Sequence, residues 1–238
     1  MKLSLVSVLA SCIVALLPST AQAQGTGTAS QYKITAAAIW QPPADFVKKA
    51  NDACGKMDSP QSFDVCFMDQ MADAGVPPQA NTFTGMLYAQ NQQVVILHAL
   101  KNFGPVDAAQ VWYPLAQTYQ YGLFLVNGEP RILDVDDEKK LDEKAMKAGP
   151  LFHSIEQKYP QVEVGPTDRS SSTPWPNAQP LPDGGIELIV TYTLLNGCDA
   201  CDHIGLVRFG WDFDAKGKFL RTVYLPMPPT PKVQHPGH

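Results

Sequence analysis

Two cysteines separated by two residues, Cys198 and Cys201, form the motif with the richest chemistry in this sequence. Such a pair can exchange electrons with other thiols, hold a metal ion, attach haem or close a short disulfide. Redox catalysis favours a first cysteine at a helix N-terminus, whereas a strand-like run follows here and Asp199 and Asp202 disfavour a thiolate. Haem attachment requires a histidine directly after the second cysteine, where Asp202 stands instead.

Metal binding is also disfavoured, because Cys198, Cys201 and His203 supply at most three ligands and no second Cys/His pair lies nearby. We therefore predict no metal site and no cofactor. The remaining interpretation is a short disulfide at a hairpin tip, which serves plain structure or preorganises a loop that inserts into a partner. The candidate binding residues are those of the tip: Asn196, Asp199, Asp202 and His203. A thiol-disulfide oxidoreductase using the two cysteines is the main enzymatic alternative, and a structural envelope protein is the third hypothesis.

Other catalytic signals are sparse. The sequence has no nucleophile elbow, phosphate loop or zinc-protease motif. His98 and His153 are predicted to be core or edge residues. Asp212 and Asp214 share one face at strand spacing and could act as paired carboxylates, but we expect Asp214 to close a turn and Asp212 to face water. These features favour a binding protein over an enzyme.

The elements that position the tip are predicted to be antiparallel strands. Apolar and polar residues alternate over 186–194 and 207–213, a third strand covers 219–225, and Asp214 to Gly217 supplies a turn. An earlier group of strands is predicted at 94–100, 109–115, 119–126 and 131–135. Asn127-Gly128 within 127–130 predicts a hairpin between the last two. The sequence leaves open whether the two meanders share one sheet.

Helices are predicted mainly before the first meander. Two segments between 43 and 74 are interrupted at Ser59-Pro60, and a third covers 78–90. The acidic run 134–138 is expected to open a helix to about Lys147, and a short helix follows up to Tyr159. Helices segregated from antiparallel meanders indicate an α+β fold, with an N-terminal helical hairpin and a helix between the meanders. We predict one domain over 35–225, with a long Pro-rich loop at about 165–185.

The termini indicate export. Residues 1–23 resemble a signal peptide, with Lys2, an apolar run and an Ala-Gln-Ala cleavage site. Cleavage before Cys12 would instead give a lipoprotein. No later apolar stretch approaches the roughly 18 residues of a transmembrane helix, so we expect a periplasmic or secreted protein. Residues 24–34 are predicted to be a flexible arm, and 226–238 a disordered Pro-rich tail.

Four cysteines follow the predicted signal. Proximity favours pairing Cys54 with Cys66 and Cys198 with Cys201, among three arrangements that four cysteines allow. The first bridge would join the two N-terminal helices and is expected to be structural, contributing about 3 kcal/mol in the chain-entropy treatment. The second bridge contributes less and is explained less well by stability alone.

The charge is mildly acidic. The chain carries −5, and loss of Lys2 leaves −6, because the 18 basic residues become 17 against 23 acidic ones. Nucleic-acid binding needs clustered Lys and Arg, which are absent from the sequence. An acidic protein of this kind would instead suit a basic protein partner.

Several motifs resemble a group of secreted bacterial proteins of unknown function, which implies no activity. These are Gly197-Cys198-Asp199-Ala200-Cys201, the run 210–220, Gly104-Pro105-Val106-Asp107 and Leu125-Val126-Asn127-Gly128. More remotely, the order of Phe67-Met68-Asp69-Gln70-Met71 with Pro77, the cysteine loop and Lys216-Gly217-Lys218-Phe219 resembles the inhibitor of vertebrate lysozyme family.

That second resemblance implies an antiparallel sheet whose short disulfide-closed loop plugs the active-site cleft of a lysozyme. The family's loop carries a histidine and encloses four residues, whereas only two residues separate Cys198 from Cys201 here, and neither is histidine. Residues 93–173 have no obvious counterpart in the family. If the role carries over, His203 or Asp199 replaces the loop histidine, and the expected partner is a basic, lysozyme-like protein.

Overall fold

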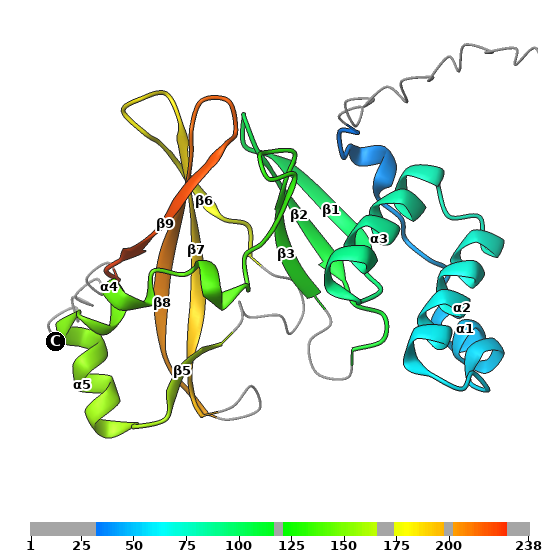
Figure 1. The fold of residues 1–238 in the computed structure, drawn as a ribbon, viewed down its shortest axis with the longest axis horizontal. Coiled ribbons are helices and arrows are strands. Elements are labelled where there is room, and N and C mark those ends of the chain that lie inside the picture. Colours follow the sequence, from blue (N-terminus) through cyan, green and yellow to red (C-terminus); the bar gives the residue numbers. More distant parts are fainter. Residues whose placement is uncertain (1–31, 117–120, 166–173, 198–201, 228–238) are drawn as a thin grey trace, which may run out of the picture. The chain divides into compact units, whose positions relative to one another are not determined.

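The computed structural model describes residues 32–116, 121–165, 174–197 and 202–227. The chain divides between Tyr32 and Lys33, so almost all described residues belong to the second unit. This unit has an N-terminal group of helices followed by two antiparallel sheets, as Figure 1 shows. The predicted α+β fold is therefore confirmed.

The helices begin where the sequence offers caps and prolines. After a short 3-10 turn, η1 (Ala36–Ala38), come α1 (Phe46–Cys54), α2 (Pro60–Asp73) and α3 (Pro78–Asn91). The hydroxyl of Ser59 accepts a hydrogen bond from the amide of Ser62 and caps α2, while Pro60 occupies its first turn. The predicted interruption at Ser59-Pro60 is confirmed.

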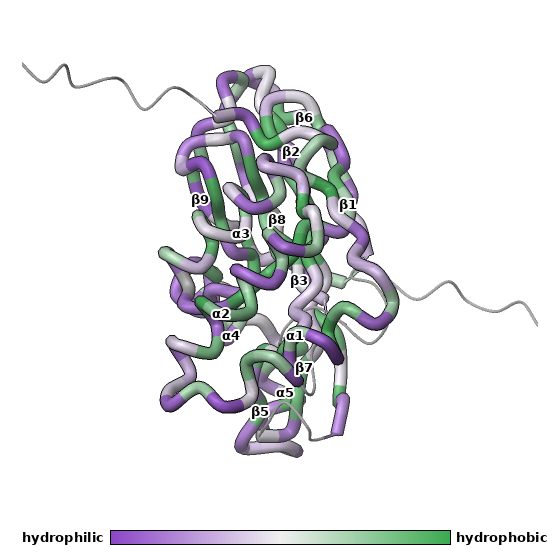
Figure 2. Tube along the Cα trace, turned by 90° about the vertical axis from the view of Figure 1, so that its right-hand side faces the viewer, coloured by the Kyte–Doolittle hydropathy of each residue, from purple (hydrophilic) through white to green (hydrophobic). Residues whose placement is uncertain are grey.

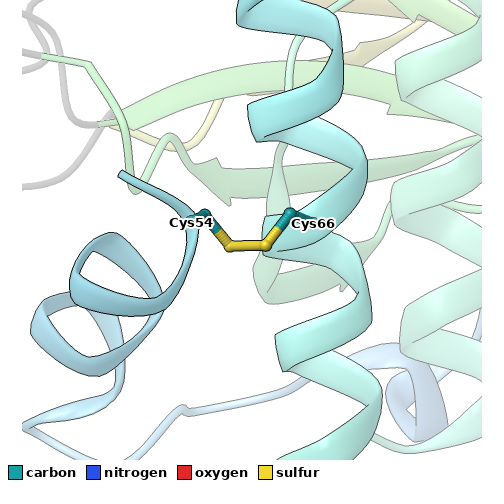
Figure 3. Close-up of a disulfide and its surroundings, with 2 residues drawn as sticks. All are labelled: Cys54 and Cys66. Atoms are coloured by element: carbon teal, nitrogen blue, oxygen red, sulfur yellow. A yellow bond between two sulfur atoms is a disulfide. The ribbon is translucent and has the colours of Figure 1, made fainter. Parts of the chain in front are cut away.

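A disulfide joins the end of α1 to the middle of α2 (Figure 3). Cys54 and Cys66 are bonded, with their Cα atoms 5.8 Å apart. Beside this bridge, Phe46 of α1 and Phe67 of α2 are buried and meet edge to face, with ring centroids 5.3 Å apart. The predicted Cys54 to Cys66 pairing is confirmed.

The first sheet has four antiparallel strands in chain order. They are β1 (Ile96–Asn102), β2 (Asp107–Trp112), β3 (Tyr121–Val126) and β4 (Ile132–Asp134), so β4 is an edge strand. The predicted hairpin joins β3 to β4, but its connection spans residues 127–131 and is longer than a two-residue Asn-Gly turn. Asn127 takes the left-handed conformation, with φ of 65°.

The second sheet contains the strands that carry the predicted tip. Its order is β5 (Val162–Gly165), β7 (Ile186–Asn196), β8 (His203–Phe213) and β9 (Phe219–Leu225), while β6 (Asn177–Pro180) also pairs with β7. The turn prediction is confirmed, since the amide of Gly217 bonds to the carbonyl of Asp214 at 3.0 Å. The two meanders thus form separate sheets.

The prediction of an uninterrupted loop over 165–185 is wrong, because β6 lies within it. All four β6 residues are exposed, so the strand shows no apolar alternation and is held by its backbone pairing with β7. β5 was also missed, although Val164 is buried against the core. Short strands paired along a longer one carry a weak sequence signal.

The predicted helix from the acidic run to Lys147 is also wrong in extent. Two short pieces replace it, η2 (Glu138–Lys140) and α4 (Glu143–Lys147), before α5 (Pro150–Lys158). Asp137 caps the first piece and Asp142 caps the second, each through a side-chain oxygen. Between them Leu141 is extended and buried in the core.

The main core joins the two sheets. Alternate residues of β3, β7 and β8 meet in it. Figure 2 colours the chain by hydropathy, and hydrophilic residues interrupt the apolar ones along β7 and β8 but not along β3. At its centre the Tyr192 hydroxyl donates to the Val135 carbonyl at 2.7 Å, and Trp211 Nε1 donates to the Tyr192 oxygen at 3.1 Å. This chain of hydrogen bonds ties the second sheet to the segment that follows β4.

The predicted flexible arm, residues 24–34, extends too far. Ile34 is fully buried, and its backbone N–H and C=O bond to the side-chain amide of Asn127, both at 2.8 Å. Ile34 is held in place by Asn127, which is 93 residues further along the chain, and local composition does not reveal such a contact. The predicted signal peptide, residues 1–23, and most of the predicted tail, residues 228–238, lie outside the described residues.

Candidate functional site

The hairpin of β7 and β8 brings the described members of the predicted site together. The two strands pair from Ile186 opposite Phe213 to Leu195 opposite His203, and beyond them the amide of Asn196 donates to the carbonyl of Asp202 at 3.1 Å. Asn196, Asp202 and His203 therefore lie at one end of the hairpin. Cys198, Asp199 and Cys201 lie outside the described residues, so their pairing and placement stay predictions.

The end of the hairpin is accessible to a partner. Asp202 and His203 are exposed, and Asn196 is partly exposed. Leu206 on the same strand is 48% exposed, so it adds an apolar side chain to the accessible surface of the hairpin. Sequence analysis did not single out Leu206, although its place between the buried-face residues Gly205 and Val207 would have put it on the opposite face.

One side of this hairpin end is supported by a neighbouring strand. β5 pairs with β7 from Thr193 to Asn196, whereas β9 pairs with β8 only from Arg208 onward. The stretch His203–Val207 thus has no strand on its outer side among the described residues. A polar tip on a braced strand, beside an unpaired strand edge, is a geometry suited to contact with another protein.

A second cluster involves one of the predicted carboxylates. Asp214 closes the turn as expected, and hydrogen bonds from the amides of Lys218 and Lys216 lower the pKa of its exposed carboxyl. The expectation that Asp212 faces water is wrong, because only 3% of this residue is exposed. Its partner in strand register is Glu187, which is 5% exposed.

The two buried carboxyl groups occupy the centre of a polar row across four strands. Gln179 of β6 donates to Glu187, and Arg221 of β9 donates through Nε to Asp212 Oδ2 at 3.0 Å. Asp212 Oδ1 is buried without a hydrogen-bond partner among the described residues. Burial, and then the negative charge of Asp212, raise the pKa of Glu187.

The two described histidines outside the hairpin have different environments. His98 is half-buried and meets the ring of Tyr121 edge to face, with centroids 5.6 Å apart, as a strand-edge packing residue does. The prediction for His153 is wrong, because this side chain on α5 is largely exposed. Within the described residues, no group of three His, Cys, Asp or Glu side chains is arranged to hold a metal ion.

Comparison with family models, curated proteins and solved structures finds no match for this chain. Across the described ranges, no helix is long and apolar enough to cross a membrane. The function is therefore argued from the geometry of the β7–β8 hairpin.

Proposed function

We propose that this chain is an exported binding protein that inhibits a basic, lysozyme-like enzyme through the end of the β7–β8 hairpin. The hydrogen bond between Asn196 and Asp202 carries the proposal, because it closes the strand ladder directly beside two exposed polar side chains, those of Asp202 and His203. A hairpin end held in this way loses little conformational entropy when it enters a cleft.

Charge supports the choice of partner. The chain after the predicted signal carries −6, and Asp202 is exposed at the tip. Complementary potentials speed the encounter with a basic enzyme and favour a fixed orientation. His203 beside it can donate or accept a hydrogen bond inside a polar cleft.

Export is supported by the bonded Cys54 and Cys66. Disulfides persist in oxidising compartments such as the periplasm and the extracellular space, and they are rare in the cytosol. The predicted signal at residues 1–23 agrees with this location.

The test is the rate of cell-wall lysis by animal-type and bacteriophage-type lysozymes, with and without excess oxidised protein comprising residues 24–238. We expect inhibition that weakens by about tenfold in Asp202→Ala and in His203→Ala, which corresponds to about 1.4 kcal/mol each. Both side chains are exposed, so the thermal midpoint should stay within error.

Matched controls are Asp73→Ala at the end of α2 and His153→Ala on α5, both of which replace exposed residues outside the β7–β8 hairpin. These variants should inhibit as well as the unmodified chain. Absence of inhibition of every lysozyme tested, or equal inhibition by all four variants, would contradict the proposal.

A further inference from the structure

A second concave surface lies away from the hairpin, between helix α3 and the edge strand β4. It encloses about 670 Å³, within the range of protein ligand sites. Met86 and Ala89, nearly one turn apart on α3, form one wall, and Ile132 of β4 contributes the other apolar wall. We call this surface the α3–β4 groove.

Ile132 of β4 presents its backbone N–H and C=O along this groove, with no backbone partner for them among the described residues. Two backbone hydrogen bonds fix the pattern: the amide of Asn127 donates to the carbonyl of Arg131 at 3.0 Å, and the amide of Val135 donates to the carbonyl of Leu123 at 3.5 Å. In an antiparallel pair, alternate residues bond to the same neighbour, so the N–H and C=O of Ile132 point away from β3. In the part of the chain that the structure describes, β4 is the last strand of its sheet, so no strand of that part pairs with its outer edge.

Some charged side chains that line the groove form an ion pair with each other, and Arg131 has no such partner among the described residues. Asp137 and Lys140 form an ion pair with each other, and Lys140 lowers the pKa of the Asp137 carboxyl. Arg131 also lines the groove and is half-buried, yet its guanidinium has no carboxylate partner among the described residues. An anionic group entering the groove would therefore find its cation at Arg131.

Strand direction decides which end of a peptide reaches that cation. The other strands of this sheet are all antiparallel to their neighbours. A strand added antiparallel to β4 runs from the Asp134 side toward Arg131, so its C-terminus arrives beside the guanidinium. A residue preceding that terminus then lies opposite Ile132, with its side chain over Met86 and Ala89.

We propose that the α3–β4 groove binds the C-terminal end of an extended peptide with apolar side chains, by adding it as a fifth strand next to β4 with its terminal carboxylate on Arg131. Main-chain bonds supply affinity in such strand addition, while the side-chain pocket and the carboxylate contact supply selectivity. This site is independent of the hairpin, and the proposal does not rest on the inhibitor function.

The test is fluorescence anisotropy with N-terminally fluorescein-labelled Gly-Thr-X-Thr-X peptides, where X is Val, Leu, Ile or Phe. Each peptide is measured as the free acid and as the C-terminal amide. We expect at least one free acid to bind. Its amide should bind at least about tenfold more weakly, because a charge-assisted contact with Arg131 is lost. Arg131→Gln should bind the acid as weakly as the unmodified protein binds the amide.

Two further variants test the groove itself. Ala89→Trp, at an exposed position of α3, should fill the groove and abolish binding while leaving the fold intact. Lys139→Gln removes a neighbouring exposed cation that does not line the groove, so it should bind as the unmodified protein does. The proposal is overturned by equal binding of acid and amide, by full binding to Arg131→Gln, by no binding of any peptide, or by a dimer that occupies the groove instead.

Discussion

Replacing Tyr192 with phenylalanine tests the connection between the two sheets most directly. The change keeps the ring, which is fully buried against Phe209, and removes only the hydroxyl. That hydroxyl donates to the Val135 carbonyl at 2.7 Å and accepts from Trp211 Nε1 at 3.1 Å. Val135 and Trp211 are each 0% exposed, so water cannot replace the lost partner.

The cost follows from those two orphaned groups. Each buried polar group left without a partner costs about 1–3 kcal/mol, so we expect a total of about 2–6 kcal/mol. For a chain of this size, 1 kcal/mol changes the thermal midpoint by about 2–4 °C, so a loss of about 2–6 kcal/mol predicts a decrease of roughly 4–24 °C.

The assay is urea unfolding followed by tryptophan fluorescence, together with a thermal melt by circular dichroism. Tyr224→Phe is the matched control, because Tyr224 is only partly buried and its hydroxyl has no hydrogen bond among the described residues. This control should change the free energy of unfolding by less than about 0.5 kcal/mol. A loss for Tyr192→Phe no larger than that of the control would refute the proposed link between the sheets.

Three further predictions concern other parts of the fold. Because folding raises the pKa of Glu187, the free energy of unfolding should fall as pH rises from the ordinary glutamate pKa through the raised one. Glu187→Gln should lack this loss, so its stability relative to the unmodified protein should grow with pH in urea unfolding between pH 4 and 8. Parallel pH profiles of the two proteins would contradict this prediction. Changing Cys54 and Cys66 to serine, which opens a loop with a sequence separation of 12, should cost about 3 kcal/mol in urea unfolding, and an unchanged midpoint would argue against the bond. Asn127→Ala should lower the free energy of unfolding by about 1–3 kcal/mol, because the Asn127 side chain bonds to the buried backbone of Ile34. The measurement is the protease resistance of the segment around Ile34, and undiminished resistance would contradict this role.

Local patterns were sufficient wherever one residue type or spacing determines the backbone. Ser59 and Pro60 marked the start of α2 because capping and a fixed φ act within one helical turn. Asp214 and Gly217 marked their turn because turn preferences also act within a few residues, and Gly217 takes a positive φ of 83°. The long strands β7 and β8 were recognisable because each buries one face over many residues.

The candidate site was predictable only in part. The sequence placed Asn196, Asp202 and His203 near one hairpin end, and the register confirms that they meet there. Alternation along β8 could have placed Leu206 on the outer face, but the sequence did not indicate that β9 stops short of the tip, since this depends on which strands lie alongside. The α3–β4 groove was missed, because its walls are distant in sequence and each of them looks like ordinary core.

By itself the amino-acid sequence determined the α+β class, the helix starts, the main strands and the Cys54 to Cys66 pairing, because propensity, alternation and short loop closure act over a few residues. Only the tertiary structure decided that the meanders form two sheets and that Asp212 is buried opposite Glu187. The same polar residue on a strand can face water or a buried neighbour, and the free energy that selects between them comes from contacts between segments far apart in the chain.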